Sequence, residues 1–122
     1  MKKIAIVTGG TSGIGLATAR ALTAGGYIVY TFSRRGGQAR DLSVDVTDEA
    51  AVASAVSQVV AAEGRLDLVV NCAGFGISGA VEFTETADAM RLFDVNFFGM
   101  VRVNRAALPH LRATGGRIIN VS

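Results

Sequence analysis

Small polar residues and glycines follow the first apolar run of the chain in the order of a phosphate-binding turn. Residues 3–7, KIAIV, have the pattern of a buried strand, residues 8–15 read TGGTSGIG, and a helical pattern begins within that segment. Glycines let the backbone come close to a pyrophosphate, and the first N–H groups of a helix point at the anion. This order predicts a binding site for the phosphates of a nucleotide.

The elements that must position this turn alternate between strands and helices. Thr47 is the expected N-cap of the second helix, and Gly64 is expected to end it. The connection between the second and third strands is too short for a helix. The alternation predicts an α/β domain with a parallel sheet and right-handed crossovers. We expect strands at residues 4–7, 27–32, 42–46, 66–70 and 117–121, and helices at 13–24, 48–63 and 86–113.

Composition argues against several classes of function. Half of the 122 residues are hydrophobic, which suits a sheet buried on both faces, yet no apolar run reaches the ~18–20 residues of a membrane span. The net charge is only +2, so we expect no nucleic-acid partner. Cys72 is the single cysteine and is expected in the core, and His110 has no metal-ligand spacing, so we expect no metal. No signal peptide follows the N-terminal lysines, which favours a cytoplasmic location.

Four motifs occur in a fixed order: TGxxxGxG at residues 8–15, DVTD at 45–48, NCAG at 71–74, and Asn96 in the long helix. With this order and spacing the chain resembles the short-chain dehydrogenase/reductase family over essentially its whole length. Cys72 stands where the family's NNAG motif has its second asparagine. The resemblance implies a Rossmann-like, open doubly wound sheet of five parallel strands in the order 3-2-1-4-5.

The resemblance also implies roles for residues at the carboxyl edge of this sheet. Asp45 and Val46 would border the adenine, and Asn71, Ala73 and Gly74 would line the ribose side. The residues of the glycine turn would bind the cofactor phosphates: Gly9, Thr11, Ser12, Gly13, Ile14 and Gly15.

The second expected strand is followed by Ser33, Arg34 and Arg35. Members of the family that prefer NAD usually carry an acid where this chain has Ser33. A guanidinium binds a 2′-phosphate through bidentate charge-assisted hydrogen bonds, whereas an acid repels it. We therefore expect the cofactor to be NADP(H) in preference to NAD(H).

The catalytic residues of the family are only partly present. Asn96 matches the catalytic asparagine, which in the family holds a water of the proton relay. The family's Tyr-x-x-x-Lys pair, whose tyrosine is the general acid/base, is absent: tyrosines occur only at positions 27 and 30, and lysines only at 2 and 3. Ser122 matches the first serine of the family's Ser-Ser pair. We therefore expect residues 1–122 to be one dinucleotide-binding domain, truncated before the catalytic Ser, Tyr and Lys. Alone it would lack ordinary dehydrogenase turnover, and Asn96 would be structural.

Two other functions remain open from the residues alone. One is a non-catalytic structural protein that keeps the fold, oligomerises and binds no nucleotide. The other is an enzyme that receives a Tyr/Lys pair from another chain. The expected helix 86–113 is apolar on more than one side, and the expected strand 117–121 is an exposed edge. We expect a homo-oligomer that forms through both.

Overall fold

A computed structural model describes residues 2–76 and 79–121 of the chain. Strands and helices alternate in it, with one 3₁₀ turn and one π-helical segment, which carry the labels η1 and η2. The elements are β1 (Ile4–Thr8), α1 (Gly13–Ala24), β2 (Ile28–Ser33), β3 (Asp41–Ser43), α2 (Glu49–Glu63), β4 (Leu68–Asn71), η1 (Val81–Phe83), α3 (Thr86–Phe93), η2 (Asp94–Phe98), α4 (Gly99–Thr114) and β5 (Arg117–Asn120).

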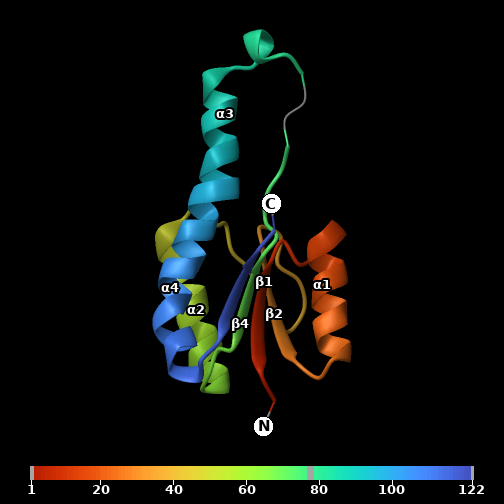
Figure 1. Ribbon diagram of the computed structural model, residues 1–122, viewed down its shortest axis with the longest axis vertical. Helices are drawn as coiled ribbons and strands as arrows, with labels where there is room; N and C mark the ends of the chain where they lie inside the picture. Colours follow the sequence, from red (N-terminus) through yellow and green to blue (C-terminus); the bar gives the residue numbers. More distant parts are fainter. Residues whose placement is uncertain (1, 77–78, 122) are drawn as a thin grey trace.

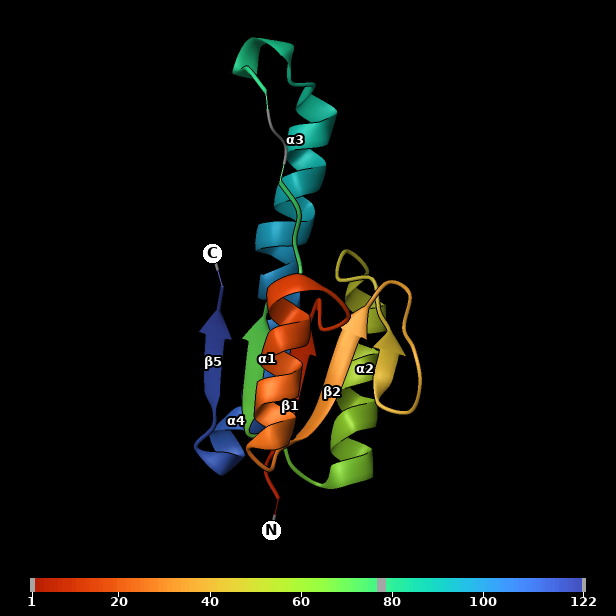
Figure 2. The same cartoon turned by 90° about the vertical axis from the view of Figure 1, so that its right-hand side faces the viewer.

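The strands form one parallel sheet in the order β3-β2-β1-β4-β5, which confirms the predicted fold and strand order. Helix α1 covers one face of the sheet, and helices α2 and α4 cover the other (Figure 1). Strand β5 lies at an edge of the sheet (Figure 2). Because all the strands run in one direction, their carboxyl ends share one edge, where α/β sheets bind their ligands.

Alternating side chains of the central strand divide the core between the two faces of the sheet. Ile4 and Ile6 of β1 join the larger cluster, which β1 shares with α2 and α4. Ala5 and Val7 join the smaller cluster on the α1 side. All residues of β1 are buried, so the strand reads as one continuous apolar run.

The start of helix α2 differs from the prediction by one residue. The N-cap is Asp48, whose Oδ1 accepts a hydrogen bond from the Ala51 N–H at 3.1 Å. Thr47 is already engaged, because both its hydroxyl and its N–H donate to Asp45 Oδ1, at 2.7 and 3.0 Å. Gly64 ends the helix with a φ of +78°, as predicted from its position.

The third strand is shorter than predicted. Only Asp41–Ser43 pair with β2, and the chain then leaves the sheet, although Val44 and Val46 remain buried. In the sequence, the apolar character of these two valines suggested that the strand continued to residue 46. The connection from Ser33 to Asp41 contains no helix, which confirms the prediction from its length.

The expected single helix over residues 86–113 has three parts. Helix α3 leads into a π-helical segment at Asp94–Phe98, and α4 continues from Gly99 to Thr114. Helix α3 extends beyond the carboxyl edge of the sheet (Figure 1). A π segment of this kind shifts the helical register and is frequent at functional sites. The segment contains Asn96.

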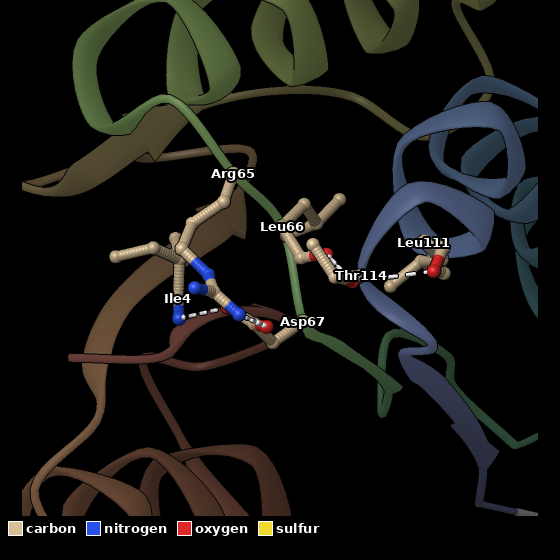
Figure 3. A network of polar contacts seen from close by, with 6 residues as sticks. All are labelled: Ile4, Arg65, Leu66, Asp67, Leu111 and Thr114. Carbon is tan, nitrogen blue, oxygen red and sulfur yellow. Dashed lines mark hydrogen bonds and ion pairs between the residues drawn. The ribbon is translucent and has the colours of Figure 1, made fainter. Parts of the chain in front are cut away.

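At the opposite edge of the sheet, Asp67 ties β1 to the segment before β4 (Figure 3). Its Oδ2 accepts from the Ile4 N–H at 2.9 Å and from Arg65 Nε at 2.8 Å, and its Oδ1 accepts from Arg65 Nη2 at 2.5 Å. The side chain of Asp67 is only 7% exposed. The Thr114 hydroxyl donates to the Leu66 carbonyl at 2.7 Å and so fixes the end of α4 beside it.

Within the described residues, no helix has the length and apolar character needed to cross a membrane.

Candidate functional site

The glycine turn brings the first turn of α1 against the ends of β1 and β4. Gly9 has a φ of +66°, and a Cβ placed on it would lie 3.0 Å from the Ala73 backbone. A Cβ on Gly15 would overlap the Gly9 carbonyl group. Glycine at both positions is therefore required for this close approach.

The amino end of α1 is suited to an anion. Ser12 is its N-cap, and the Ser12 side chain makes no capping hydrogen bond. The first turn contains no acidic residue that would offset the positive end of the helix dipole. Ile14, at this end, is 65% exposed. The N–H groups and the dipole therefore favour a phosphate here.

A cavity of about 830 Å³ lies along the carboxyl edge of the sheet. The turns after β1, β2, β3 and β4 and the long helix contribute to its wall. Its volume falls in the range of about 300–1,000 Å³ that is usual for ligand sites. The lining residues are Gly9, Thr11, Ser12, Phe32, Ser33, Arg34, Arg35, Gly36, Val44, Asp45, Val46, Thr47, Ala73, Gly74, Phe75, Arg91, Asp94 and Val95.

The turn after β2 holds two arginines at the cavity wall. The Gly36 N–H donates to Ser33 Oγ at 3.2 Å, and the Ser43 hydroxyl donates to the Arg34 carbonyl at 2.9 Å. These hydrogen bonds fix the backbone against β3, while the Arg34 and Arg35 side chains stay exposed. The wall thus offers two guanidinium groups to an anionic ligand.

The turn after β3 carries Asp45 and Val46. The N–H and hydroxyl of Thr47 donate to the Asp45 carboxylate and hold its pKa below the ordinary value, with Arg34 and Arg102 adding to the effect. The carboxylate is therefore ionised at neutral pH and fixed in direction. Val46 is 7% exposed and packs beneath the cavity against the long helix.

The segment after β4 bends across the end of β1 because one hydroxyl accepts from two N–H groups. Thr8 Oγ1 takes hydrogen bonds from Cys72 N and Ala73 N, each at 3.0 Å. This places Ala73 and Gly74 in the cavity wall. Burial raises the pKa of the Cys72 thiol, and a hydrogen bond with Thr18 partly opposes that rise.

Asn71 lies below this wall. It is 5% exposed, and its Nδ2 donates to Asn104 Oδ1 at 2.8 Å and to Asn120 Oδ1 at 2.9 Å. The cluster links β4, α4 and β5. In this structure Asn71 supports the site from beneath instead of lining the large cavity.

Asn96 fixes the loop that follows β4. Its Oδ1 accepts from Phe75 N at 2.9 Å, and its Nδ2 donates to the Phe75 carbonyl at 2.7 Å. A Cβ on Gly74 would lie 2.6 Å from Asn96 Oδ1, so any larger residue there would displace the Asn96 amide from its hydrogen bonds with Phe75. Both ends of the amide are therefore occupied by the backbone.

The predicted site residues divide into two groups. Ten line the large cavity: Gly9, Thr11, Ser12, Ser33, Arg34, Arg35, Asp45, Val46, Ala73 and Gly74. Five lie outside its lining: Gly13, Ile14 and Gly15 in the first turn of α1, and two supporting residues, the buried Asn71 and the partly buried Asn96.

Four lining residues of the long helix and its neighbouring loop were absent from the sequence prediction: Arg91, Asp94, Val95 and Phe75. The Arg91 guanidinium carbon lies 5.2 Å from the centre of the Phe75 ring. The signal was the position of Arg91 and Asp94 shortly before Asn96 in one helix. Among the described residues, no group of histidine, cysteine and acidic side chains is arranged to hold a metal ion.

Comparison with known proteins agrees with this geometry. The model of the short chain dehydrogenase family matches residues 3–122. A 3-ketodihydrosphingosine reductase of Bacteroides thetaiotaomicron is 42% identical, over 98% of this chain and 46% of that protein. The meso-2,3-butanediol dehydrogenase of Serratia marcescens is 33% identical, over 98% of this chain and 53% of that protein.

Solved structures show the same relationship. A short-chain dehydrogenase from Streptomyces avermitilis superposes with a TM-score of 0.93 at 36% identity, over 100% of this chain and 49% of that one. The protein ElxO with NADP bound gives 0.89 at 30% identity, over 100% of this chain and 56% of that one. The chain spans about half the length of the relatives it matches. On its motifs, its fold and these matches, the chain belongs to the short-chain dehydrogenase family.

Proposed function

We propose that residues 1–122 form one dinucleotide-binding domain that prefers NADP(H) to NAD(H). The observation that carries the proposal is the cavity of about 830 Å³, on which the glycine turn and the turn with Arg34 and Arg35 converge. The amino end of α1 lies beside it. Gly13 and Ile14 would present N–H groups to the pyrophosphate.

The preference for NADP(H) rests on the charges of the wall. In the described part of the chain, three arginines and two aspartates line the cavity, and both residues that follow Ser33 are arginines. Ser33 carries no charge that would repel a 2′-phosphate, and its oxygen is occupied by Gly36 N–H. The NADP-bound ElxO supports the proposal as a relative that binds this cofactor.

The remaining roles follow from position along the wall. Asp45 and Val46 would border the adenine, and Ala73 and Gly74 would pass close to the ribose. Asn71 would hold this segment from below through its hydrogen bonds with Asn104 and Asn120.

We also propose that this chain alone does not turn over a substrate. Tyr30 is 8% exposed in the core, and Tyr27 precedes β2 at the amino edge, so neither lines the cavity. The chain's lysines, Lys2 and Lys3, precede β1 at that same edge. NADPH consumption with ketone and aldehyde substrates should therefore equal the buffer rate. Turnover well above that rate would contradict this part of the proposal.

The experiment that tests the cofactor preference is calorimetric titration with NADPH and NADH. The double variant Arg34→Ala/Arg35→Ala should raise the Kd for NADPH by about ten- to a hundredfold, because charge-assisted hydrogen bonds contribute about 1.5–3 kcal/mol. Its Kd for NADH should change little.

The matched control is Arg105→Ala/Arg112→Ala, which removes two exposed arginines that do not line the cavity. It should leave both Kd values unchanged. Equal loss of NADPH affinity in the two double variants would show a general charge effect and refute the assignment to Arg34 and Arg35.

A second candidate function is a non-catalytic structural protein that assembles through its uncovered surfaces and binds no nucleotide. It is favoured by exposed apolar side chains along the long helix and on or just after β5, which pairs only with β4 among the described strands. They are Met90, Phe93, Phe97, Phe98, Val101, Leu108, Ile119 and Val121. Surfaces of this kind commonly mark interaction sites.

The occupant that we propose for these surfaces is a second copy of the chain, and the homo-oligomer is compatible with either function. Light scattering at tens of micromolar should give a mass above that of one chain. A sharp monomer mass would refute assembly. An oligomer without any affinity for NADPH would favour the structural function.

A further inference from the structure

Arg102 joins two parts of the cavity wall without lining the cavity itself. It lies on α4, and its Nη1 donates to the Val46 carbonyl at 3.0 Å and to the Asp94 carbonyl at 3.1 Å. Its Nη2 donates to Asp94 Oδ1 at 2.5 Å. Val46 and Asp94 both line the cavity, whereas Arg102 does not. One guanidinium therefore connects the turn after β3 to the start of the π segment.

The turn that Arg102 holds lies beyond the paired residues of the sheet. Strand β3 ends at Ser43, so the backbone of Val46 has left the sheet. The Val46 side chain packs against Gly99, where a Cβ would lie 2.7 Å from Val46 Cγ2. Gly99 thus permits α4 to come close to Val46. Arg102, three residues later on α4, fixes the position of the segment after β3 by donating to the Val46 carbonyl.

Arg102 also controls charge at the wall. The Asp94 side chain is 42% exposed, and a bare carboxylate there would face the same cavity as the phosphates of a dinucleotide. The ion pair with Arg102 offsets that negative charge. The Arg102 side chain is only 21% exposed, so solvent screens the pair less than it screens a surface pair.

We propose that Arg102 is a positioning residue for the adenine end of the dinucleotide site. It fixes the position of Val46 relative to Asp94. Its positive charge also offsets the charge of the Asp94 carboxylate, so that the wall accepts an anionic cofactor. The inference rests on the proposed binding of a dinucleotide. It adds that the affinity depends on a residue that does not touch the ligand.

The test is titration of Arg102→Leu with NADPH and with adenosine 2′,5′-bisphosphate, which carries the adenine end alone. We expect Kd to rise about tenfold for both ligands, equivalent to ~1.4 kcal/mol. Arg105→Leu is the matched control: Arg105 lies on the same helix, is 79% exposed and pairs with Glu49 at 3.7 Å. Its Kd values should equal those of the unaltered chain.

Arg102→Lys separates positioning from charge. Lysine keeps the positive charge but lacks the planar fork that reaches two carbonyls and a carboxylate together. We expect it to restore only part of the affinity. Full restoration would overturn the positioning role, and so would a Kd for Arg102→Leu equal to that of the unaltered chain.

Two further measurements keep the outcomes distinct. If the unaltered chain binds neither ligand, the proposed function fails and the inference fails with it. If Arg102→Leu does not fold by circular dichroism, Arg102→Lys carries the test, and its affinity must lie below that of the unaltered chain. Amide hydrogen exchange at residues 44–47 should be faster in either folded variant, and unchanged exchange there would overturn the inference.

Discussion

Replacing Asp67 by asparagine removes the charge from the cluster at the amino edge of the sheet. The carboxylate accepts two hydrogen bonds from Arg65 and one from the Ile4 N–H (Figure 3). Asparagine has one acceptor oxygen, so its NH₂ group must face a donor. Asp67→Asn therefore loses charge-assisted hydrogen bonds and leaves a buried donor poorly satisfied.

The expected loss of unfolding free energy is about 2–3 kcal/mol. Breaking a buried ion pair costs about 3–5 kcal/mol, and a hydrogen bond to a charged group contributes about 1.5–3 kcal/mol. We place the loss below the first range because the Arg65 side chain is 27% exposed and keeps contact with water. Against a typical total of about 5–15 kcal/mol this is a large effect.

Urea unfolding followed by circular dichroism measures this loss of unfolding free energy. With a slope of about 1–3 kcal/mol per molar urea, the midpoint should fall by roughly 1 M or more. Glu82→Gln is the control, because Glu82 is exposed on η1, and its midpoint should not move. A loss below about 0.5 kcal/mol for Asp67→Asn would refute the assignment of the cluster as a tie between β1 and β4.

The same cluster makes a prediction about pH. The hydrogen bonds from Arg65, and then that from Ile4 N–H, hold the Asp67 pKa below its ordinary value. The contribution of Asp67 is therefore fully present above its unfolded pKa of about 3.9 and is lost as pH falls through the lower folded value. The stability gap between the unaltered chain and Asp67→Asn should narrow on acidification below pH ~4. A gap that stays constant would contradict this cause.

Two predictions concern the carboxyl edge of the sheet. Gly15→Ala places a Cβ against the Gly9 carbonyl and should lower the stability by more than about 3 kcal/mol. The Cβ of Gly13→Ala meets nothing within 4 Å, so this variant should lose only the ~1–2 kcal/mol of a left-handed conformation. Thermal unfolding compares them, and equal costs would contradict the packing described for the turn. Asn96→Ala frees the Phe75 backbone and should speed amide exchange at residues 73–76 and weaken NADPH binding several-fold; unchanged exchange would show that the amide does not hold this loop.

The strands and helices were predictable from the sequence because their information is local, whereas the strand order followed from the resemblance to the family. Each strand is a short apolar run, and the glycines that end α2 and α4, Gly64 and Gly115, have the positive φ values common at the ends of helices. Parallel strands with right-handed crossovers then leave few possible arrangements. The glycine turn was equally visible, because its chemistry is contained within eight consecutive residues.

The errors arose where a contact between distant segments decides the structure. Thr47 and Asp48 are both good N-caps, and Asp48 prevails because Asp45 engages Thr47. The π segment has no marker, since its apolar residues suit a regular helix. Arg102 contacts Val46 only because the long helix passes the turn after β3, and a sequence pattern does not encode that proximity.

The most direct test of the central claim is NMR titration of the isotope-labelled chain with NADPH. We predict saturable shifts of the backbone amides in residues 9–15, 33–36 and 45–47, with the signals around Asp67 unmoved. We also predict that NADH produces the shifts at 9–15 only at higher concentration. Absence of any saturable shift, or shifts confined to the exposed face of the long helix, would contradict dinucleotide binding at this edge of the sheet.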